Sequence, residues 1–364
     1  IIPNLKELPP EHWNDDLFAP HVEKVKKFIW ETIGVPPTTD NHPACPVDLA
    51  LLECMATWLD DEDTDIVKEV RTGVSSQIGK TTKSKVWPSK SKAKKFDPFF
   101  DTKGKVLWSR NYSSLEEAPA IVKQMVEKDL RDQMEKGFLE KCDQKDLKFM
   151  GVLHAVVEEV DSQGNPVKVR LVWDGTQIGV NTGVRHLVSQ ELPGPEELIE
   201  SIRYVKNKQV TMNMVEQLYL FKYDIKSAFK LVPVCDKNDF GFVVNHTDGQ
   251  QQWYRWRTCP FGWILSGYYF SRLVGLVVRL EKLITANLCH CFSKLIFVDD
   301  GCTLAGESKI YLLAGVTLLL LRALGFPISW KKTCLGTALP WVGYLFSLLK
   351  QPYVGLTDAK MKLI

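Results

Sequence analysis

The sequence predicts an α+β fold built around a central antiparallel sheet. Segments with the apolar pattern of strands occur in pairs joined by turn sequences, as in 153–160 and 167–174 around Asp-Ser-Gln-Gly-Asn-Pro. Segments with helical periodicity separate these pairs. This mixture of hairpins and helices favours α+β over a doubly wound α/β fold, in which single strands and helices alternate.

Composition sets the broad class. The chain has 364 residues, is 45% hydrophobic and 25% charged, and can bury a substantial core. Its nine cysteines form no CxxC pair and there is no secretory signal, which favours free thiols and an intracellular location. His42, Cys45 and Cys54 lack the second ligand pair that a zinc site needs. The longest apolar stretch, 311–326, is short for a membrane span and contains Arg322, so we expect no membrane contact.

Residues 1–110 form the first predicted region. Helical spacing is visible in 28–35 and 46–62, and a lysine-rich stretch then interrupts it. The lysines of this stretch are Lys80, Lys83, Lys85, Lys90, Lys92, Lys94 and Lys95. Such a stretch is either a solvated linker or a surface that meets phosphates. The first residue is not Met, from which we expect a fragment of a longer protein.

The remaining elements follow in order. A helix is predicted from Pro119, a residue favoured at helix starts, to Gly137, a residue favoured at helix ends. After the 153–174 hairpin we expect strand 218–225, a hairpin of 241–246 and 252–258 around Thr247-Asp248-Gly249, helix 266–282, a hairpin around 297–301, helix 309–324, and strands 339–346 and 353–356.

Acidic residues end two of the predicted strands. Asp299 and Asp300 follow the apolar run Leu295–Val298 and precede Gly301. One interpretation is a plain turn, since Asp and Gly adopt the backbone angles that hairpin turns need. The other is a metal site, which requires a partner carboxylate, and Asp224 at the end of strand 218–225 is the candidate. Two Mg²⁺ ions about 3.5–4 Å apart, or Mn²⁺ in their place, would neutralise such carboxylates and support phosphoryl transfer.

Several motifs in a fixed order extend this interpretation. They are Glu135–Cys142, Lys168–Asn181, "FKYDIKSAF" at 221–229, "DGQQQWYRWRTCPFGW" at 248–263, "FVDD" at 297–300, "LGFPISWKKT" at 324–333 and "LPWVGYLF" at 339–346. From Pro119 to Ile364 the chain resembles the reverse transcriptases of retroelements, of the LTR or tyrosine-recombinase type. The resemblance implies the fingers and palm of a right-hand polymerase, with fingers in 111–215 and a palm with its primer-grip strand in 216–364.

The resemblance implies roles for the acidic residues and for one lysine. Asp224 and Asp299 would ligate both cations, Asp300 would support the site, and the main-chain carbonyl of Ile225 would add a ligand. Lys332, or its neighbour Lys331, would stand near the leaving pyrophosphate as a proton donor.

It also implies contacts to nucleotide and primer. Phe229 would lie under the sugar and exclude a ribose 2′-OH, and Arg170 with Lys168 would hold the triphosphate. Gly262 would allow close backbone approach. The primer end would be placed by Trp341, Gly343 and Tyr344. The alternative for Phe229 and for these last aromatic residues is ordinary core packing, and for Lys168 it is a solvated hairpin charge.

The expected function is therefore an RNA-directed DNA polymerase from a mobile-element polyprotein. Its partners would be an RNA or DNA template with primer, dNTPs, and downstream thumb and RNase H domains. A viral RNA-dependent RNA polymerase is a weaker alternative, because Phe229 and Val298 depart from what such palms use. A domesticated, non-catalytic nucleic-acid-binding or assembly module is the other alternative. Two departures from the family are Phe261, where a Gln is usual, and Gly175-Thr176 after Asp174.

Overall fold

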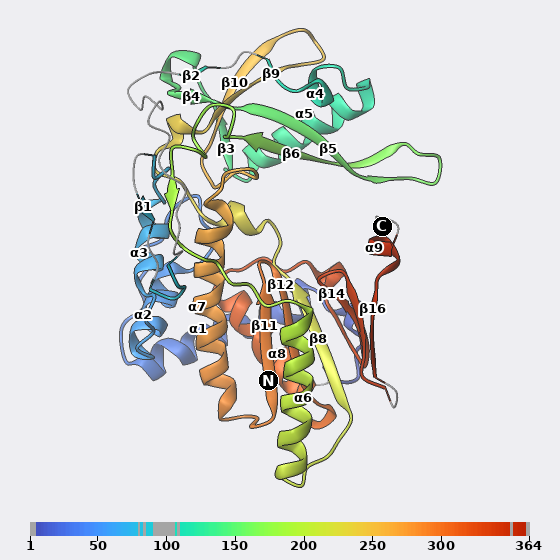
Figure 1. The fold of residues 1–364 in the computed structure, drawn as a ribbon. Helices are drawn as coiled ribbons and strands as arrows, with labels where there is room; N and C mark the ends of the chain where they lie inside the picture. Colours follow the sequence, from blue (N-terminus) through green and yellow to red (C-terminus); the bar gives the residue numbers. More distant parts are fainter. Residues whose placement is uncertain are drawn as a thin grey trace.

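A computed structural model describes residues 5–78, 81–82, 85–89, 106–107, 110–349 and 352–361. The fold is α+β, as the sequence predicts, and the elements gather into an upper and a lower lobe (Figure 1). The upper lobe holds most of 110–186 and 237–262, and the lower lobe holds most of the rest.

The lower lobe is built on a four-stranded antiparallel sheet. Its strand order is β11-β12-β8-β13, formed by Phe292–Phe297, Asp300–Gly306, Leu218–Asp224 and Cys334–Gly336. Side chains of β8 enter two different cores, Phe221 and Tyr223 in one, Leu218 and Leu220 in the other. Burial on both faces explains why β8 reads as a nearly continuous apolar run.

Helices cover both faces of this sheet. The core that contains Phe221 and Tyr223 is the larger of the two, and α7 (Ser266–Ala286) and α8 (Glu307–Ala323) pack against the sheet on this side. α6 (Pro195–Thr211) packs against β11 and β12 on the opposite face, where Leu218 and Leu220 lie. α8 begins at Glu307 instead of 309, and α7 continues past Lys282 to Ala286, so both predictions are confirmed with shifted ends.

A second, three-stranded sheet adjoins β8. It is formed by β14 (Ala338–Trp341), β15 (Tyr344–Ser347) and β16 (Tyr353–Leu356), and α9 (Asp358–Met361) follows it. The strands expected at 339–346 and 353–356 are therefore present, but the first is split into a hairpin.

The upper lobe has a five-stranded sheet of order β2-β4-β9-β10-β3 beside the long β5–β6 hairpin. These strands are Val106–Leu107, Phe149–Met150, Gly241–Asn245, Gln251–Trp256 and Leu139–Lys141, with β5 at Val152–Val160 and β6 at Pro166–Asp174. Helices α4 (Ser113–Glu116) and α5 (Ala120–Glu135) flank them, which confirms the predicted helix after Pro119 and both predicted hairpins.

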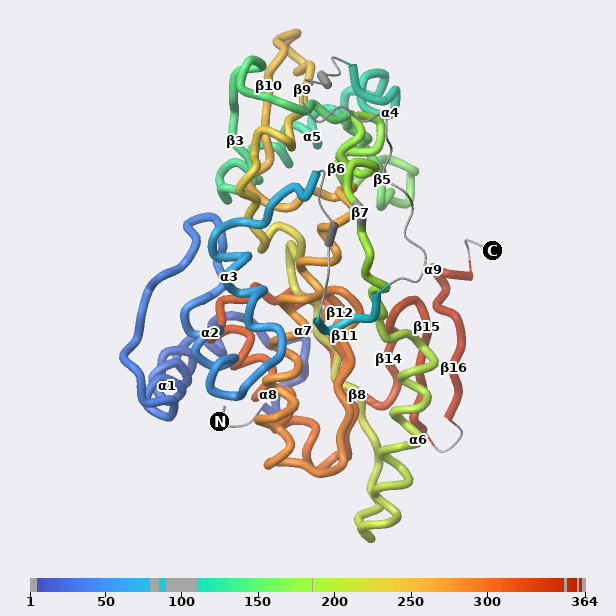
Figure 2. Tube along the Cα trace, turned by 60° about the vertical axis from the view of Figure 1, so that its left-hand side comes forward, coloured from blue at the N-terminus to red at the C-terminus, as the bar shows by residue number. Residues whose placement is uncertain are grey.

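The N-terminal helices are α1 (Asp15–Ile33), α2 (Leu49–Trp58) and α3 (Asp65–Thr72). α1 packs on α8, and α2 and α3 pack on α7 (Figure 2), so their apolar faces join the larger core. Short elements complete the chain: β1 (Thr81–Thr82) pairs with β7 (Arg185–His186), and single 3-10 turns include η1 (Pro10–His12), η3 (Ala228–Leu231), η4 (Lys237–Asp239) and η5 (Trp330–Lys332). Within the described ranges, no helix is both long and apolar enough to cross a membrane.

Candidate active site

Strand pairing brings the predicted acidic residues together. In the antiparallel register of β8 with β12, Asp224 lies opposite Asp300. The N–H of Ile225 donates to the carbonyl of Asp299, with an N···O distance of 3.0 Å. The three aspartates therefore meet at one end of the central sheet, although β9, β10, α7 and β11 separate β8 from β12 in sequence.

The hairpin predicted around 297–301 is present, but its two turn residues are not those that Asp-Asp-Gly favours. The β11–β12 register pairs Phe297 with Asp300, so the two turn residues are Val298 and Asp299. Val298 has a φ of 54°, which is unusual for a β-branched residue and marks local strain. Gly301 does not supply the positive φ. It lies in β12, where an added Cβ would meet the ring of Tyr223 at 2.1 Å, so close packing requires the glycine.

Two lysines face the acidic residues. The Nζ of Lys332 donates to Oδ2 of Asp224 at 2.7 Å, and the Nζ of Lys222 lies 3.4 Å from Oδ1 of Asp300. The Asp224 side chain is almost fully buried, whereas Lys332 is largely exposed. The ammonium group of Lys332 is therefore in direct contact with Asp224, which the sequence predicts as a metal ligand.

The electrostatics of the aspartates follow from burial and mutual repulsion. Burial, followed by the charge of Asp224, raises the pKa of Asp299 to about 6. Burial also raises the pKa of Asp300, and Lys222 opposes this shift. Burial lowers the pKa of Lys332, but the hydrogen bond to Asp224 and the surrounding carboxylates outweigh it and leave that pKa raised. At neutral pH the carboxylates therefore repel one another, and the ammonium groups of Lys222 and Lys332 offset part of that repulsion.

The oxygen atoms of these carboxylates are donors that suit a hard cation. Oδ1 of Asp300 is shielded from solvent, and the Lys222 ammonium lies 3.4 Å from it, without the geometry of a well-formed hydrogen bond. Within those residues, however, no three His, Cys, Asp or Glu side chains are arranged closely enough to hold a metal ion. One oxygen of Asp224 is instead occupied by Lys332.

The predicted primer-grip residues lie on the β14–β15 hairpin. The buried Trp341 donates its Nε1–H to the carbonyl of Asp300 at 3.2 Å, so this residue is tied to the acidic site. Gly343 has a φ of 78° in the two-residue turn, as a hairpin turn of the primed type requires. Tyr344 faces α9, where the Nζ of Lys360 lies 3.8 Å from its ring centroid.

The predicted sugar-contacting residue belongs to an aromatic cluster. Phe229 lies in η3, and its ring centroid is 5.2 Å from that of Phe261 and 6.1 Å from that of Phe270. The guanidinium of Arg170 lies 4.8 Å from the Phe261 ring centroid and is paired with Glu158 at 2.6 Å. Phe261 therefore links Arg170 to Phe229.

Lys168 is held away from this cluster in its own ion pairs. Its Nζ lies 3.0 Å from Glu158 and 3.2 Å from Glu159 on the same hairpin. The structure thus does not bring Lys168 into contact with the predicted acidic or aromatic residues in the described part of the chain.

Gly262 lies where a side chain cannot fit. Its φ is 98°, and an added Cβ would lie 2.0 Å from the carbonyl oxygen of Trp173. Asn181 fastens this loop, because its side chain donates to the carbonyl of Gly262 at 2.8 Å and accepts from the N–H of Ile264 at 3.0 Å. Asn181 ends one of the motifs that the sequence analysis quotes, but only the fold shows that it binds the Gly262 loop.

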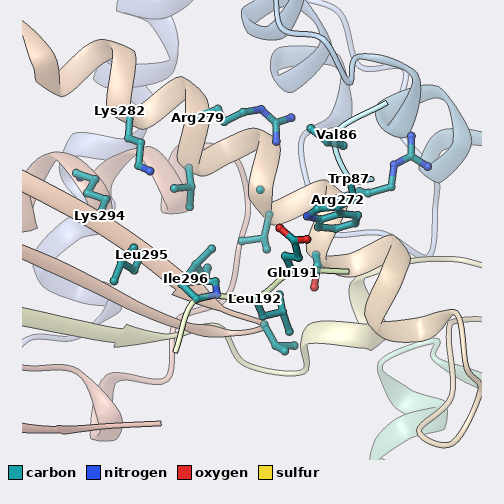
Figure 3. A pocket seen from close by; sticks show the side chains of 16 residues that line it. Val86, Trp87, Glu191, Leu192, Arg272, Arg279, Lys282, Lys294, Leu295 and Ile296 are labelled. Atoms are coloured by element: carbon teal, nitrogen blue, oxygen red, sulfur yellow. The ribbon is translucent and has the colours of Figure 1, made fainter. Parts of the chain in front are cut away.

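A cavity of about 220 Å³ lies behind the acidic site, between α7, β11 and residues 191–193 (Figure 3). Val298 lines it, while the next residue, Asp299, belongs to the acidic site. Most of its lining is apolar, and Arg279 and Lys282 lie along α7 at its edge. It contains neither Asp224 nor the aromatic cluster.

The fold and site define an α+β protein with three aspartates and a lysine at one end of an antiparallel sheet. No protein-family model matches the chain, and no curated protein matches it. Among solved structures, the chain is similar to the foamy viral protease-reverse transcriptase dRH in complex with double-stranded DNA, at 16% sequence identity and a TM-score of 0.49. The alignment covers 93% of this chain and 49% of that chain.

Proposed function

We propose that the chain is the fingers and palm of a reverse transcriptase, which adds dNTPs to the 3′ end of a primer on an RNA template. The observation that carries this proposal is the pairing of Asp224 with Asp300 across β8 and β12, with Asp299 in the adjoining turn. The motif order in the sequence supports it, since the strand motifs of the acidic residues fall on adjacent strands of one sheet.

The metal-binding residues of the proposal are Asp224 and Asp299, with Asp300 and the Ile225 carbonyl in support. Bound Mg²⁺ would supply activation of the primer 3′-OH and charge stabilisation at the phosphate. Asp224 would exchange its contact with Lys332 for a cation. The freed ammonium of Lys332 would then donate a proton to the leaving pyrophosphate.

The nucleotide would lie against the aromatic cluster. Phe229 would sit beneath the sugar, and Phe261 would hold Arg170 by a cation–π contact on its ring face. Arg170 suits a triphosphate because its planar guanidinium donates two parallel hydrogen bonds, but it must exchange Glu158 for the phosphate.

Primer extension tests the proposal directly. The purified chain is incubated with a labelled primer on RNA or DNA template, with dNTPs or NTPs, and with Mg²⁺ or Mn²⁺. We expect extension with dNTPs on RNA, and none for Asp299→Asn, which should still bind the duplex because it removes no phosphate contact. Duplex binding without extension by the unmodified chain would contradict the proposal, and preferential use of NTPs would point to an RNA polymerase.

One observation favours a second candidate, a non-catalytic nucleic-acid-binding or assembly module. Lys332 already neutralises Asp224, and no ready-made group of three metal-ligating side chains exists among the described residues. In that case the Lys332–Asp224 pair would be permanent. Duplex affinity would then be independent of Mg²⁺, and Lys332→Ala would weaken folding without changing any metal response.

A further inference from the structure

The N-terminal residues that precede and begin α1 contact the structure directly beneath the acidic site. The ring of Trp13 lies 6.1 Å from that of Phe221 in β8, the strand that ends at Asp224. Phe18 is fully buried, and its ring stacks on that of Trp330 with centroids 5.1 Å apart and an interplanar angle of 24°. Aromatic side chains from the N-terminal region therefore reach two elements of the candidate site.

Trp330 and Lys332 belong to the same short turn, η5. The turn is closed by hydrogen bonds from the N–H of Lys332 to the Ser329 carbonyl and from the N–H of Thr333 to the Trp330 carbonyl. It is anchored to β8 because the N–H of Ser329 donates to the Asp224 carbonyl at 2.9 Å. A displacement of the Trp330 ring would therefore move the backbone of η5, which directs the Lys332 ammonium to Asp224.

We propose that Phe18 is a positioning residue for the candidate active site, which acts through Trp330 to hold Lys332 on Asp224. This inference rests on the proposed function, in which Lys332 serves the leaving pyrophosphate. It assigns a role to a region whose sequence resembles nothing in the polymerase motifs. Parallel stacking matters more than burial here, because a flat ring fixes the orientation of its partner and an aliphatic side chain of similar size does not.

The variants are chosen to remove the stack while keeping the site filled. Phe18→Leu and Trp330→Leu each remove one ring of the stack. If one of these variants does not fold, the other still tests the inference. Trp30→Leu is the matched control: Trp30 is a buried aromatic residue of the same helix, roughly 18 Å further along its axis at 1.5 Å per residue. All variants are compared by thermal unfolding before any rate is measured.

Single-turnover extension then separates positioning from folding. We expect Phe18→Leu and Trp330→Leu to lower kcat by about ten- to a hundredfold, the effect of a catalytic group displaced by about 1 Å, with KM for the primer–template unchanged. Phe18→Leu should cost little further rate in a Lys332→Ala background, since no ammonium remains to be positioned. An equal loss in both backgrounds, or an equal loss in Trp30→Leu, would overturn the inference.

A second readout needs no catalysis. Acetylation of lysines by a water-soluble active ester is followed by mass spectrometry, with the neighbouring exposed Lys331 as internal reference. Loss of the stack should raise the acetylation rate of Lys332 relative to Lys331 by about two- to fivefold, the range of a partly exposed ion pair. If the acetylation ratio of Lys332 to Lys331 is the same in the stack variants and the unmodified chain, the positioning role of Phe18 is overturned. If the ratio changes but the unmodified chain does not extend primers, only the proposed function is overturned.

Discussion

At the scale of single residues, Asp299 has the least favourable electrostatic position in the site. It shares the sheet end with Asp224 and Asp300, and burial and repulsion raise its pKa to about 6 from an ordinary 3.8. The folded state therefore binds a proton more tightly than the unfolded state. The contribution of Asp299 to stability is greatest below its unfolded pKa and falls as the pH rises towards 6. A cation bound at neutral pH would reverse this loss.

This gives a pH-dependent prediction for the metal-free protein. Asp299→Asn should raise the free energy of unfolding at pH 7.5 by about 1 kcal/mol, a discounted value because the carboxyl is partly exposed and screened. The gain should vanish near pH 4, where the carboxyl is protonated. In the unmodified chain, Mg²⁺ should raise Tm at pH 7.5 and much less at pH 5. Chemical and thermal unfolding measure both effects, and a pH-independent Mg²⁺ response would contradict the metal-site proposal.

Phe229 carries the prediction on sugar choice. Phe229→Ala and Phe229→Val should raise incorporation of ribonucleotides relative to deoxyribonucleotides, because the ring would no longer clash with a 2′-OH. The measurement is the ratio of kcat/KM for the two nucleotides in primer extension. If both variants discriminate as the unmodified chain does, Phe229 serves only to pack against Phe261 and Phe270.

At the scale of elements, a bidentate ion pair fixes the N-terminal helices to α7. The guanidinium of Arg272 donates to both oxygens of Asp63, at 2.6 and 2.9 Å, and also to Glu69 in α3. Arg272 and Asp63 are both buried, so neither charge has ready access to water if its partner is removed. Arg279 repeats the arrangement with Asp61 about two turns further along α7.

We therefore expect Asp63→Ala to lower the free energy of unfolding by about 3 kcal/mol, the cost of leaving a buried charge without its main partner. The matched control is Asp15→Ala, because Asp15 pairs with Arg322 at 2.9 Å but is half exposed. That change should cost less than about 1 kcal/mol. Equal effects of the two substitutions on urea unfolding would show that the buried pair does not anchor the helices.

Most elements could be predicted because their signals are local. Pro119 and Gly137 bracket α5 closely, and the turn sequences of the β5–β6 and β9–β10 hairpins lie where expected. A hairpin around 297–301 could be predicted, but not which two residues form its turn. The Asp-Asp-Gly sequence favours a turn one or two residues after the observed turn at Val298 and Asp299. The packing of Gly301 on Tyr223 and the pairing of β12 with β8 set the observed register instead.

At the scale of the whole molecule, the lysine-rich stretch 80–95 carries a further prediction. Lys85 pairs with Asp65 at 2.6 Å, whereas Lys80, Lys83, Lys90, Lys92, Lys94 and Lys95 lie outside the described residues. We expect that this stretch adds affinity for nucleic acid without sequence preference. Neutralising Lys90, Lys92, Lys94 and Lys95 should flatten the log–log salt dependence of binding by roughly one unit for each phosphate that these lysines neutralise.

Titration of a labelled RNA–DNA hybrid at several salt concentrations measures this slope. The loss of affinity should be greatest at low salt, and turnover at saturating substrate should stay unchanged because none of these lysines belongs to the acidic site. Overlapping curves for the quadruple variant and the unmodified chain would identify the stretch as a linker without a binding role.

The fold class, the order of the elements and the identity of the acidic residues could all be predicted without coordinates, since each rests on short patterns of polarity and turn chemistry. The sequence also predicts that Asp224 meets Asp299 and Asp300, but it does not predict the register in which they pair or the other contacts of the site. The direct pairing of Asp224 with Asp300, the contact of Lys332 with Asp224 and the stacking of Phe18 on Trp330 join residues far apart in the chain. Such contacts depend on strand register and helix packing, which are set by many weak interactions at once and leave no mark in any single segment.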